Sequence, residues 1–129
     1  MTNGKSDNLR VRLEEALERT KAIGRCRALA IARRDGLIIV HRLEPGLDPH
    51  LVAAMAAATV GAAEASAREL RQGKVERVII ECAQGKIVTM EAGPDAILLA
   101  LYDHDANLGL ALHGLTQAAQ RVDELLTAL

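Results

Sequence analysis

Apolar residues recur at helical spacing at both ends of the chain. The steps of three and four residues predict a helix from about 8 to 22, with Asp7 as its N-cap, and a second helix over 108–129. In so short a chain we expect the second helix to lie on a sheet rather than in a coiled coil. The repeating positions are Leu9, Leu13, Ala16 and Leu17 in the first helix, and Leu108, Leu112, Leu115, Ala119, Val122, Leu126 and Leu129 in the second.

The middle of the chain carries short β-prone runs separated by turn residues. Asp35-Gly36 joins the first two runs and is a strong hairpin signal, because both residues tolerate the positive φ of a type I′ turn. Small and turn-forming residues at 83–85 and 92–95 separate the later runs. The predicted strands cover 26–33, 37–42, 75–82, 86–92 and 96–102.

The first predicted strand places large and small side chains on opposite faces. Leu29 and Ile31 point one way, whereas the side chains of Ala28, Ala30 and Ala32 point the other way. Both faces are apolar, so we expect both to be covered. The alanine face accepts only a neighbour that packs very close to the strand.

An alanine-rich helix over 49–72 follows this hairpin. Asp48 is a good N-cap, and Pro49 fits the first helical position. Nine of the seventeen residues from 51 to 67 are alanine, and no charge occurs from 51 to 63. Alanine is the best helix former, so a solvated surface helix is one interpretation. We favour an interface helix, because an uncharged exposed helix would form an anomalous apolar patch.

Two adjacent stripes of small residues run along this helix. Small side chains on both stripes allow two neighbours to approach closely, one on each side. We expect one stripe to pack on the sheet and the other on a second copy of the chain. The stripes are Leu51, Met55, Ala58, Ala62 and Ala65, and Val52, Ala56, Thr59, Ala63 and Ala67.

The elements follow the order α-ββ-α-βββ-α. This order predicts an α+β fold, a single-domain α/β sandwich in which a five-stranded, mostly antiparallel sheet has helices on both faces. Strand 96–102 is apolar throughout, so it belongs in the centre beside 26–33, and 37–42 and 75–82 become the edges. The alanine-rich helix should cross one face, and the first and last helices should cover the other.

Composition narrows the classes of partner. The 129 residues carry a net charge of −1, with one tyrosine and no tryptophan or phenylalanine, so nothing favours nucleic-acid binding. The polar residues 1–7 lack the apolar core of a signal peptide, and we expect a flexible tail there and one domain over 8–129. The longest uncharged stretches, near 51–63 and 106–120, are shorter than the roughly 20 residues that cross a bilayer. We therefore expect a cytoplasmic protein without direct membrane insertion.

No catalytic, cofactor-binding or metal-binding constellation stands out, so we do not expect an enzyme. His104 between Asp103 and Asp105 suggests a metal site, but such a stretch before a helix is more typical of a solvated loop and helix cap. Cys26 and Cys82 lie in apolar runs without paired-cysteine spacing. We interpret both as buried, reduced thiols.

A basic cluster surrounds the first hairpin. It comprises Arg25, Arg27, Arg33 and Arg34. The cluster is either the solvated surface of a hairpin, which we favour, or a site for an anion or an acidic partner.

The predicted edge strand 75–82 is a candidate interaction surface. An edge presents unpaired N–H and C=O groups, and this one is apolar enough to attract another strand. Antiparallel pairing of two copies would extend the sheet across a two-fold axis. One face of the strand carries Val78, Ile80 and Cys82, and the other carries Arg77, Ile79 and Glu81.

The arrangement resembles the Roadblock (dynein light-chain type) family over residues 9–127. The resemblance lies in "ALAIARRDGLIIVHRL", the small-residue helix, and "GKVERVIIECAQGKIVTMEAGPDAILLALYDHDANLGLALHGL", with the pattern D-x-x-A-N-L-G before the last helix. It implies a Roadblock/profilin-like fold and a homodimer whose third strands pair and whose central helices pack side by side. Prokaryotic members are described as regulators of Ras-like GTPases. In relatives that act on a small GTPase, the dimer stimulates hydrolysis by repositioning GTPase residues rather than by donating an arginine finger, and other family members serve as assembly modules.

The resemblance and the small-residue stripes together imply two sets of contact residues. The expected dimer interface is Val52, Met55, Ala56, Ala58, Thr59, Ala62, Ala63, Arg77, Val78, Ile79, Ile80 and Glu81. The expected GTPase contact is the outward side of the helix, at His50, Ala54, Ala57, Glu64, Arg68 and Arg71.

Three functions remain open on this basis. The first is a non-catalytic homodimeric regulator or scaffold of a small Ras-like GTPase. The second is a dimeric adaptor in a signalling or transport complex without effect on GTP hydrolysis. The third is a small-molecule sensor, which needs a pocket that small, tightly packed side chains argue against.

Overall fold

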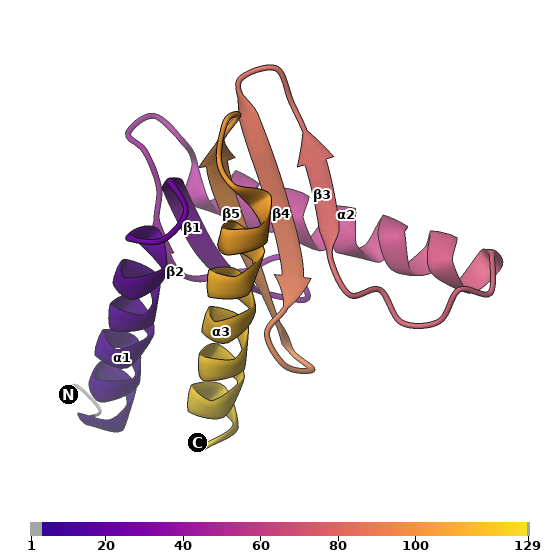
Figure 1. The fold of residues 1–129 in the computed structure, drawn as a ribbon. Helices are drawn as coiled ribbons and strands as arrows, with labels where there is room; N and C mark the ends of the chain where they lie inside the picture. The colour runs from indigo at the N-terminus through magenta and orange to yellow at the C-terminus, as the bar shows by residue number, and fades with distance from the viewer. Residues whose placement is uncertain (1–3, 129) are drawn as a thin grey trace.

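The computed structural model describes residues 4–128 and has the predicted element order (Figure 1). Its five strands form one antiparallel sheet in the order β2-β1-β5-β4-β3. β5 therefore lies in the centre beside β1, and β2 and β3 are the edges, as predicted. The elements are α1 (Gly4–Lys21), β1 (Cys26–Arg33), β2 (Ile38–Arg42), α2 (Pro49–Glu69), β3 (Val78–Glu81), β4 (Gly85–Glu91), β5 (Ala96–Asp103) and α3 (Leu108–Thr127).

Helices cover both faces of this sheet. α1 and α3 lie side by side on one face, and α2 crosses the other face and runs on past β3 (Figure 1). The α1/α3 face holds the main core, in which Leu17, Leu29, Leu98 and Leu115 are all fully buried. The apolar stripes of both terminal helices thus cover the large side chains of the sheet, as the helical spacing predicted.

The packing of α2 on the sheet involves small residues from both partners. Ala28, Ala30 and Ala32 of β1 lie on this face and are no more than 2% exposed. A small buried cluster of Ala56, Val60 and Ile97 joins α2 to the sheet. The alanine face of the first strand therefore meets a close neighbour, as the sequence predicted.

The turn between β1 and β2 also approaches α2 closely. Gly36 has φ +91°, and a Cβ atom there would lie 3.4 Å from Cα of Ala54 and 3.8 Å from Cβ of Ala57. Glycine therefore serves this position twice, because it adopts the left-handed conformation and leaves room for the helix. The contact also fixes which flank of α2 faces the hairpin.

Several predicted boundaries were wrong. The first helix begins at Gly4, so Asp7 lies in its first turn rather than at its N-cap. Residues 1–3 and Leu129 lie outside the described residues. The third strand is restricted to Val78–Glu81 instead of 75–82, because the regular ladder with β4 covers only these residues.

The tight fit between α2 and β1 predicts that bulk on the alanine face destabilises the fold. We expect Ala32→Leu to lower the free energy of unfolding by roughly 1–3 kcal/mol, since a well-packed site accepts extra methyl groups only by displacing its neighbours. Urea denaturation followed by circular dichroism measures the change. Ala22→Leu, at an exposed position, is the matched control and should stay within about 0.5 kcal/mol of the unaltered chain. Equal effects of the two substitutions would show that α2 does not pack closely on β1.

Candidate interaction surface

The edge strand β3 presents unpaired backbone groups to solvent. The amide of Cys82 donates to the carbonyl of Gly85 at 2.8 Å, and the amide of Gly85 donates back at 3.4 Å, so these two residues form a hydrogen-bonded pair. Alternation along an antiparallel ladder then directs the N–H and C=O groups of Val78 and Ile80 to β4. The corresponding groups of Ile79 and Glu81 point outward, away from the sheet.

The opposite edge, β2, is protected. Its ladder with β1 is interrupted by a register shift between Ile31 and Ala32, and such bulges disfavour the addition of another strand. Arg42 at its end is held by α1, with Nε 2.7 Å from Glu18 and Nη2 3.2 Å from Glu14. The hydrogen bond to Glu18 raises the pKa of Arg42 above its usual value, and hydrogen bonds from Arg10 and Arg42 lower the pKa of Glu14.

The outer side of α2 is an exposed apolar surface. Leu51 and Met55 are each 57% exposed, and Ala58, Ala62 and Ala65 on the same stripe are also exposed. In the adjacent predicted stripe only Ala56 is buried, and Val52, Thr59, Ala63 and Ala67 are half-buried, so this stripe lies along one side of the helix instead of facing the sheet. Sheet contact comes chiefly from Ala53, Ala56 and Val60.

By length and composition alone, α2 is the one helix in the described part of the chain that would suit a membrane span. Ala53, Ala56 and Val60 are buried by the domain itself, so the helix forms one layer of the fold. The expected absence of membrane insertion stays a prediction.

The structure separates the residues predicted for the dimer interface. Ala56 is 2% exposed and packs on Val60 and Ile97 of its own subunit, so we remove it from the expected interface. Ala58, Ala62, Ile79 and Ile80 are exposed, as are Arg77 and Glu81, whereas Val52, Thr59, Ala63 and Val78 are half-buried. Met55 is exposed as well. Ala56 is therefore the one residue of the predicted dimer interface that is buried in the single subunit.

Two residues predicted for the GTPase contact instead face their own subunit. Ala57 packs against the small cluster beneath α2, close to Gly36. Glu64 accepts hydrogen bonds from Arg34 at 2.9 and 3.4 Å. Both side chains are half-buried, and their part in the GTPase contact stays a prediction. His50, Ala54, Arg68 and Arg71 are exposed.

The contacts of Arg34 fasten α2 to the sheet. Its guanidinium lies between Glu64 of α2 and Glu91 at the end of β4, and Lys74 lies 3.4 Å from the same Glu91 carboxylate. The hydrogen bond to Glu64 is the main reason that the pKa of Arg34 is raised. This network ties the C-terminal part of α2 to the sheet. No single sequence pattern could have revealed it, because its members are up to 57 residues apart.

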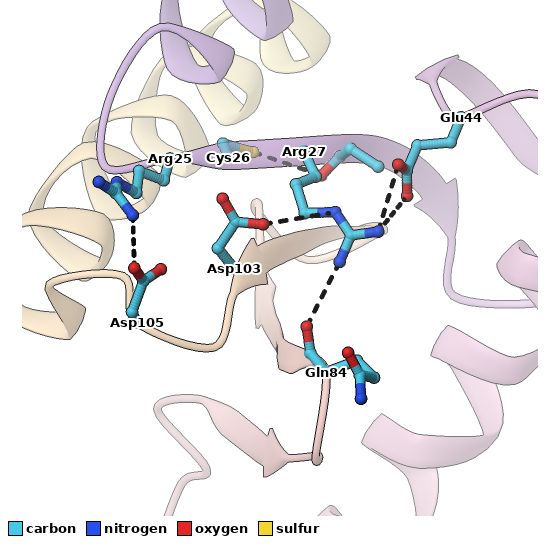
Figure 2. Close-up of polar contacts among 8 residues, drawn as sticks. Arg25, Cys26, Arg27, Glu44, Gln84, Asp103 and Asp105 are labelled. Carbon is cyan, nitrogen blue, oxygen red and sulfur yellow. Dashed lines mark hydrogen bonds and ion pairs between the residues drawn. The ribbon is translucent and has the colours of Figure 1, made fainter.

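Carboxylates also occupy the rest of the basic cluster, as Figure 2 shows for two of its members. Arg27 Nη2 donates to the Glu44 carboxylate at 3.0 and 3.2 Å, and its Nε lies 3.6 Å from Asp103. Arg25 Nη1 is 2.6 Å from Asp105 and lowers the pKa of that carboxyl group.

Arg33 is likewise paired, with Nη2 2.6 Å from Asp35. Each guanidinium of the cluster thus has a partner within the subunit. This pairing favours the hairpin interpretation over an anion site.

The two cysteines lie in different environments. Cys26 is buried, and desolvation raises the pKa of its thiol to about 11. Cys82 is exposed, so the prediction of a buried thiol was wrong there. An apolar run at a sheet edge is not covered by neighbouring strands, which explains the difference.

No group of three or more histidine, cysteine or acidic side chains among residues 4–128 is placed to hold a metal ion. The largest surface hollow described, about 530 Å³, is open and has Arg33, Arg34, Asp35 and Asp95 among its lining residues. These lining residues are mostly charged, whereas small-molecule pockets are mostly apolar and enclosed.

Comparisons with known proteins agree with this architecture. Residues 12–102 match the model of the Roadblock/LC7 domain family. The uncharacterized proteins MJ1340 and MJ0310 of Methanocaldococcus jannaschii are each 39% identical to this chain over 92 residues, which cover 71% of this chain and 80% of each relative.

Solved structures with the same fold include two MglB proteins. The gliding protein MglB from Thermus thermophilus has a TM-score of 0.83 at 19% identity, covering 100% of this chain and 96% of that chain. Myxococcus xanthus MglB has a TM-score of 0.85 at 16% identity, covering 91% and 96%. A further MglB structure, with a tetrameric arrangement, has a TM-score of 0.83 at 22% identity, covering 97% and 92%. At these identities the likeness shows the fold.

The different environments of the two thiols predict selective reactivity. At pH 8 we expect one fast reaction with a thiol reagent, at Cys82, because a thiol with a pKa of about 11 is only roughly one part in a thousand thiolate at that pH. Absorbance on reaction with a disulfide reagent counts the fast thiols before and after unfolding in urea. Cys82→Ser should abolish the fast phase and keep the slow one. A fast thiol that persists in folded Cys82→Ser protein would contradict the burial of Cys26.

Proposed function

This chain belongs to the Roadblock/LC7 domain family, and from that premise we propose that it is a non-catalytic, homodimeric regulator or scaffold of a small Ras-like GTPase. One observation supports the proposed dimer. The free edge of β3 and the part of α2 that runs past it lie on the same side of the subunit (Figure 1). In one subunit the β3 edge lacks a neighbouring strand and the apolar surface of α2 is exposed. A second copy would pair with the edge and cover the helix surface.

Pairing of β3 with its copy would place the end of each α2 over the partner's sheet. The flank of α2 with Val52, Met55, Thr59 and Ala62 points away from the hairpin, since Ala54 on the other flank touches Gly36. On that side the sheet presents apolar residues that α2 covers incompletely, namely Ile80, Ile87 and Leu101. We propose that the partner's α2 covers these residues and packs against the small-residue flank. The tetrameric arrangement of one MglB structure supports self-association in this fold.

The GTPase would then meet the outward side of the paired helices. His50, Ala54, Arg68 and Arg71 are the exposed members of the set expected there. The arginines of the first hairpin are bound by carboxylates of their own subunit and lie outside this contact set. The family resemblance implies that stimulation of hydrolysis would act by repositioning groups of the GTPase.

Binding and hydrolysis assays with small Ras-like GTPases of the source organism test this role. We expect calorimetric binding that depends on whether GDP or a non-hydrolysable GTP analogue is bound, and faster single-turnover hydrolysis if the protein is an activator. Binding without a change in rate would support the scaffold. No binding in either nucleotide state would overturn the GTPase proposal and leave a dimeric adaptor with other partners.

A charge reversal on the outward side of α2 localises the contact. We expect Arg68→Glu with Arg71→Glu to weaken GTPase binding by roughly tenfold, because charged groups at an interface are matched to the partner's charges. Arg12→Glu, exposed on α1 at the opposite face, is the control and should bind normally. Equal affinities for the two variants would place the GTPase elsewhere on the dimer.

The dimer has its own test. We expect Ala62→Glu and Ile79→Lys each to yield monomers in light scattering coupled to gel filtration, because each places a charge where an apolar contact is proposed. Both side chains are exposed in the single subunit, so the fold should persist in circular dichroism. An unchanged dimer for both variants would refute the proposed interface.

A further inference from the structure

We propose that β3 pairs with its copy in one specific register, with Ile79 opposite the partner's Ile79, and that reciprocal pairs between Arg77 and the partner's Glu81 select this register. The inference rests on the dimer proposed above and adds the rule by which the chain recognises its own copy. It follows from backbone geometry and from the order of charges along five residues.

Backbone geometry limits the registers that are available. Ile79 and Glu81 direct their N–H and C=O groups outward, and one further step of the same alternation would add Arg77, the residue directly before β3. Two antiparallel copies form hydrogen bonds only when outward-directed residues face each other. The permitted partners of Ile79 within this segment are therefore the partner's Arg77, Ile79 or Glu81.

Charge separates the permitted registers. With Ile79 opposite its copy, Arg77 faces the partner's Glu81 and Glu81 faces the partner's Arg77, and all five residues from 77 to 81 are paired. A shift of two residues in either direction leaves both charges without a partner. A shift of four residues places arginine opposite arginine or glutamate opposite glutamate, which destabilises a strand pair.

Among the described residues, Arg77 has only a long, exposed ion pair and Glu81 has none. Four residues of a strand span roughly 13 Å, so Arg77 and Glu81 of one chain cannot reach each other. Arg77 lies 4.0 Å from Glu76, whose side chain is 80% exposed. Lys86 stands opposite Glu81 on β4, but its ammonium group donates to the carbonyl of His104.

The same register also matches side chains on the two faces of the sheet. Ile79 shares its face with Val88 of the α1/α3 core, so two copies of Ile79 would meet on that face between the two charge pairs. Val78 and Ile80 lie on the α2 face. Val78 would stand opposite the partner's Ile80, and Ile80 opposite the partner's Val78. The apolar pairs thus continue the partly covered surface beneath α2.

This arrangement makes β3 a self-complementary recognition strand. A related chain whose edge lacks the arginine at one end or the glutamate at the other would leave one charge unpaired at the interface. The charge order therefore favours pairing with an identical chain over pairing with another member of the same fold.

Charge reversal and charge exchange test the register. We expect Arg77→Glu alone and Glu81→Arg alone each to weaken self-association by roughly ten- to a hundredfold, because each replaces two attractive contacts with two repulsive ones. The double variant Arg77→Glu/Glu81→Arg should return to within roughly threefold of the unaltered chain. Sedimentation equilibrium at low salt and at 1 M salt measures these constants, and the penalty of each single reversal should shrink at high salt, where the Debye length is about 3 Å.

Mixing the two single variants gives the sharpest outcome. Each heterodimer would contain two restored glutamate–arginine pairs, so native mass spectrometry should show heterodimers in large excess over either homodimer. Arg12→Glu and Glu15→Arg on exposed positions of α1 are the matched controls and should leave self-association unchanged.

Each result decides between the register and the dimer. A dimer that ignores both single reversals, or a mixture without excess heterodimer, would overturn the register and leave the dimer in place. An unaltered chain that is monomeric would overturn both. A dimer with the expected charge behaviour but no GTPase binding would uphold the register and refute only the GTPase proposal.

Discussion

The close approach of α2 to β1 is the constraint on which the rest of the structure depends. Buried alanines of β1 lie on the face that α2 covers, and Gly36 lets the hairpin turn reach the flank of the helix. Such small side chains bury little area each, so the helix also relies on the Arg34 contacts with Glu64 and Glu91. A helix held low over the sheet in this way can run past the edge strand while its outer surface stays apolar.

The two edge strands of the sheet, β2 and β3, differ in how well their backbone groups are protected from pairing with another strand. An edge strand exposes backbone groups that attract other strands, and β2 limits this by an irregular ladder and by charges shared with α1. β3 has a regular ladder with β4, and Ile79 and Ile80 are each 38% exposed. Because the projecting end of α2 lies on the side of β3, the unprotected edge and the uncovered helix surface belong to one continuous region. A symmetric partner completes such a region more simply than two unrelated partners.

Much of the fold was predictable because its signals are local. Helical spacing identified α1 and α3, the cap residues and alanine content identified α2, and alternation in β1 identified its small face. Which side of α2 faces the sheet was harder to predict, because adjacent stripes of alanine do not differ in hydrophobicity. Ala57 and Glu64 face inward because of Gly36 and Arg34, and these contacts join residues about 20 to 30 positions apart. Cys82 was misplaced for a related reason, since an apolar run indicates burial only where other elements cover both of its faces.

The chemical difference between the two flanks of α2 bears on how one helix can serve two partners. The flank with Val52, Met55, Thr59 and Ala62 is small and uncharged, which suits a permanent contact with an identical helix. The opposite flank and the helix end carry His50, Arg68 and Arg71, which suit a polar, reversible contact. Self-association would therefore use the apolar flank and leave the polar one in solvent. A regulatory partner that must bind and leave would find its surface already separated from the one that holds the dimer together.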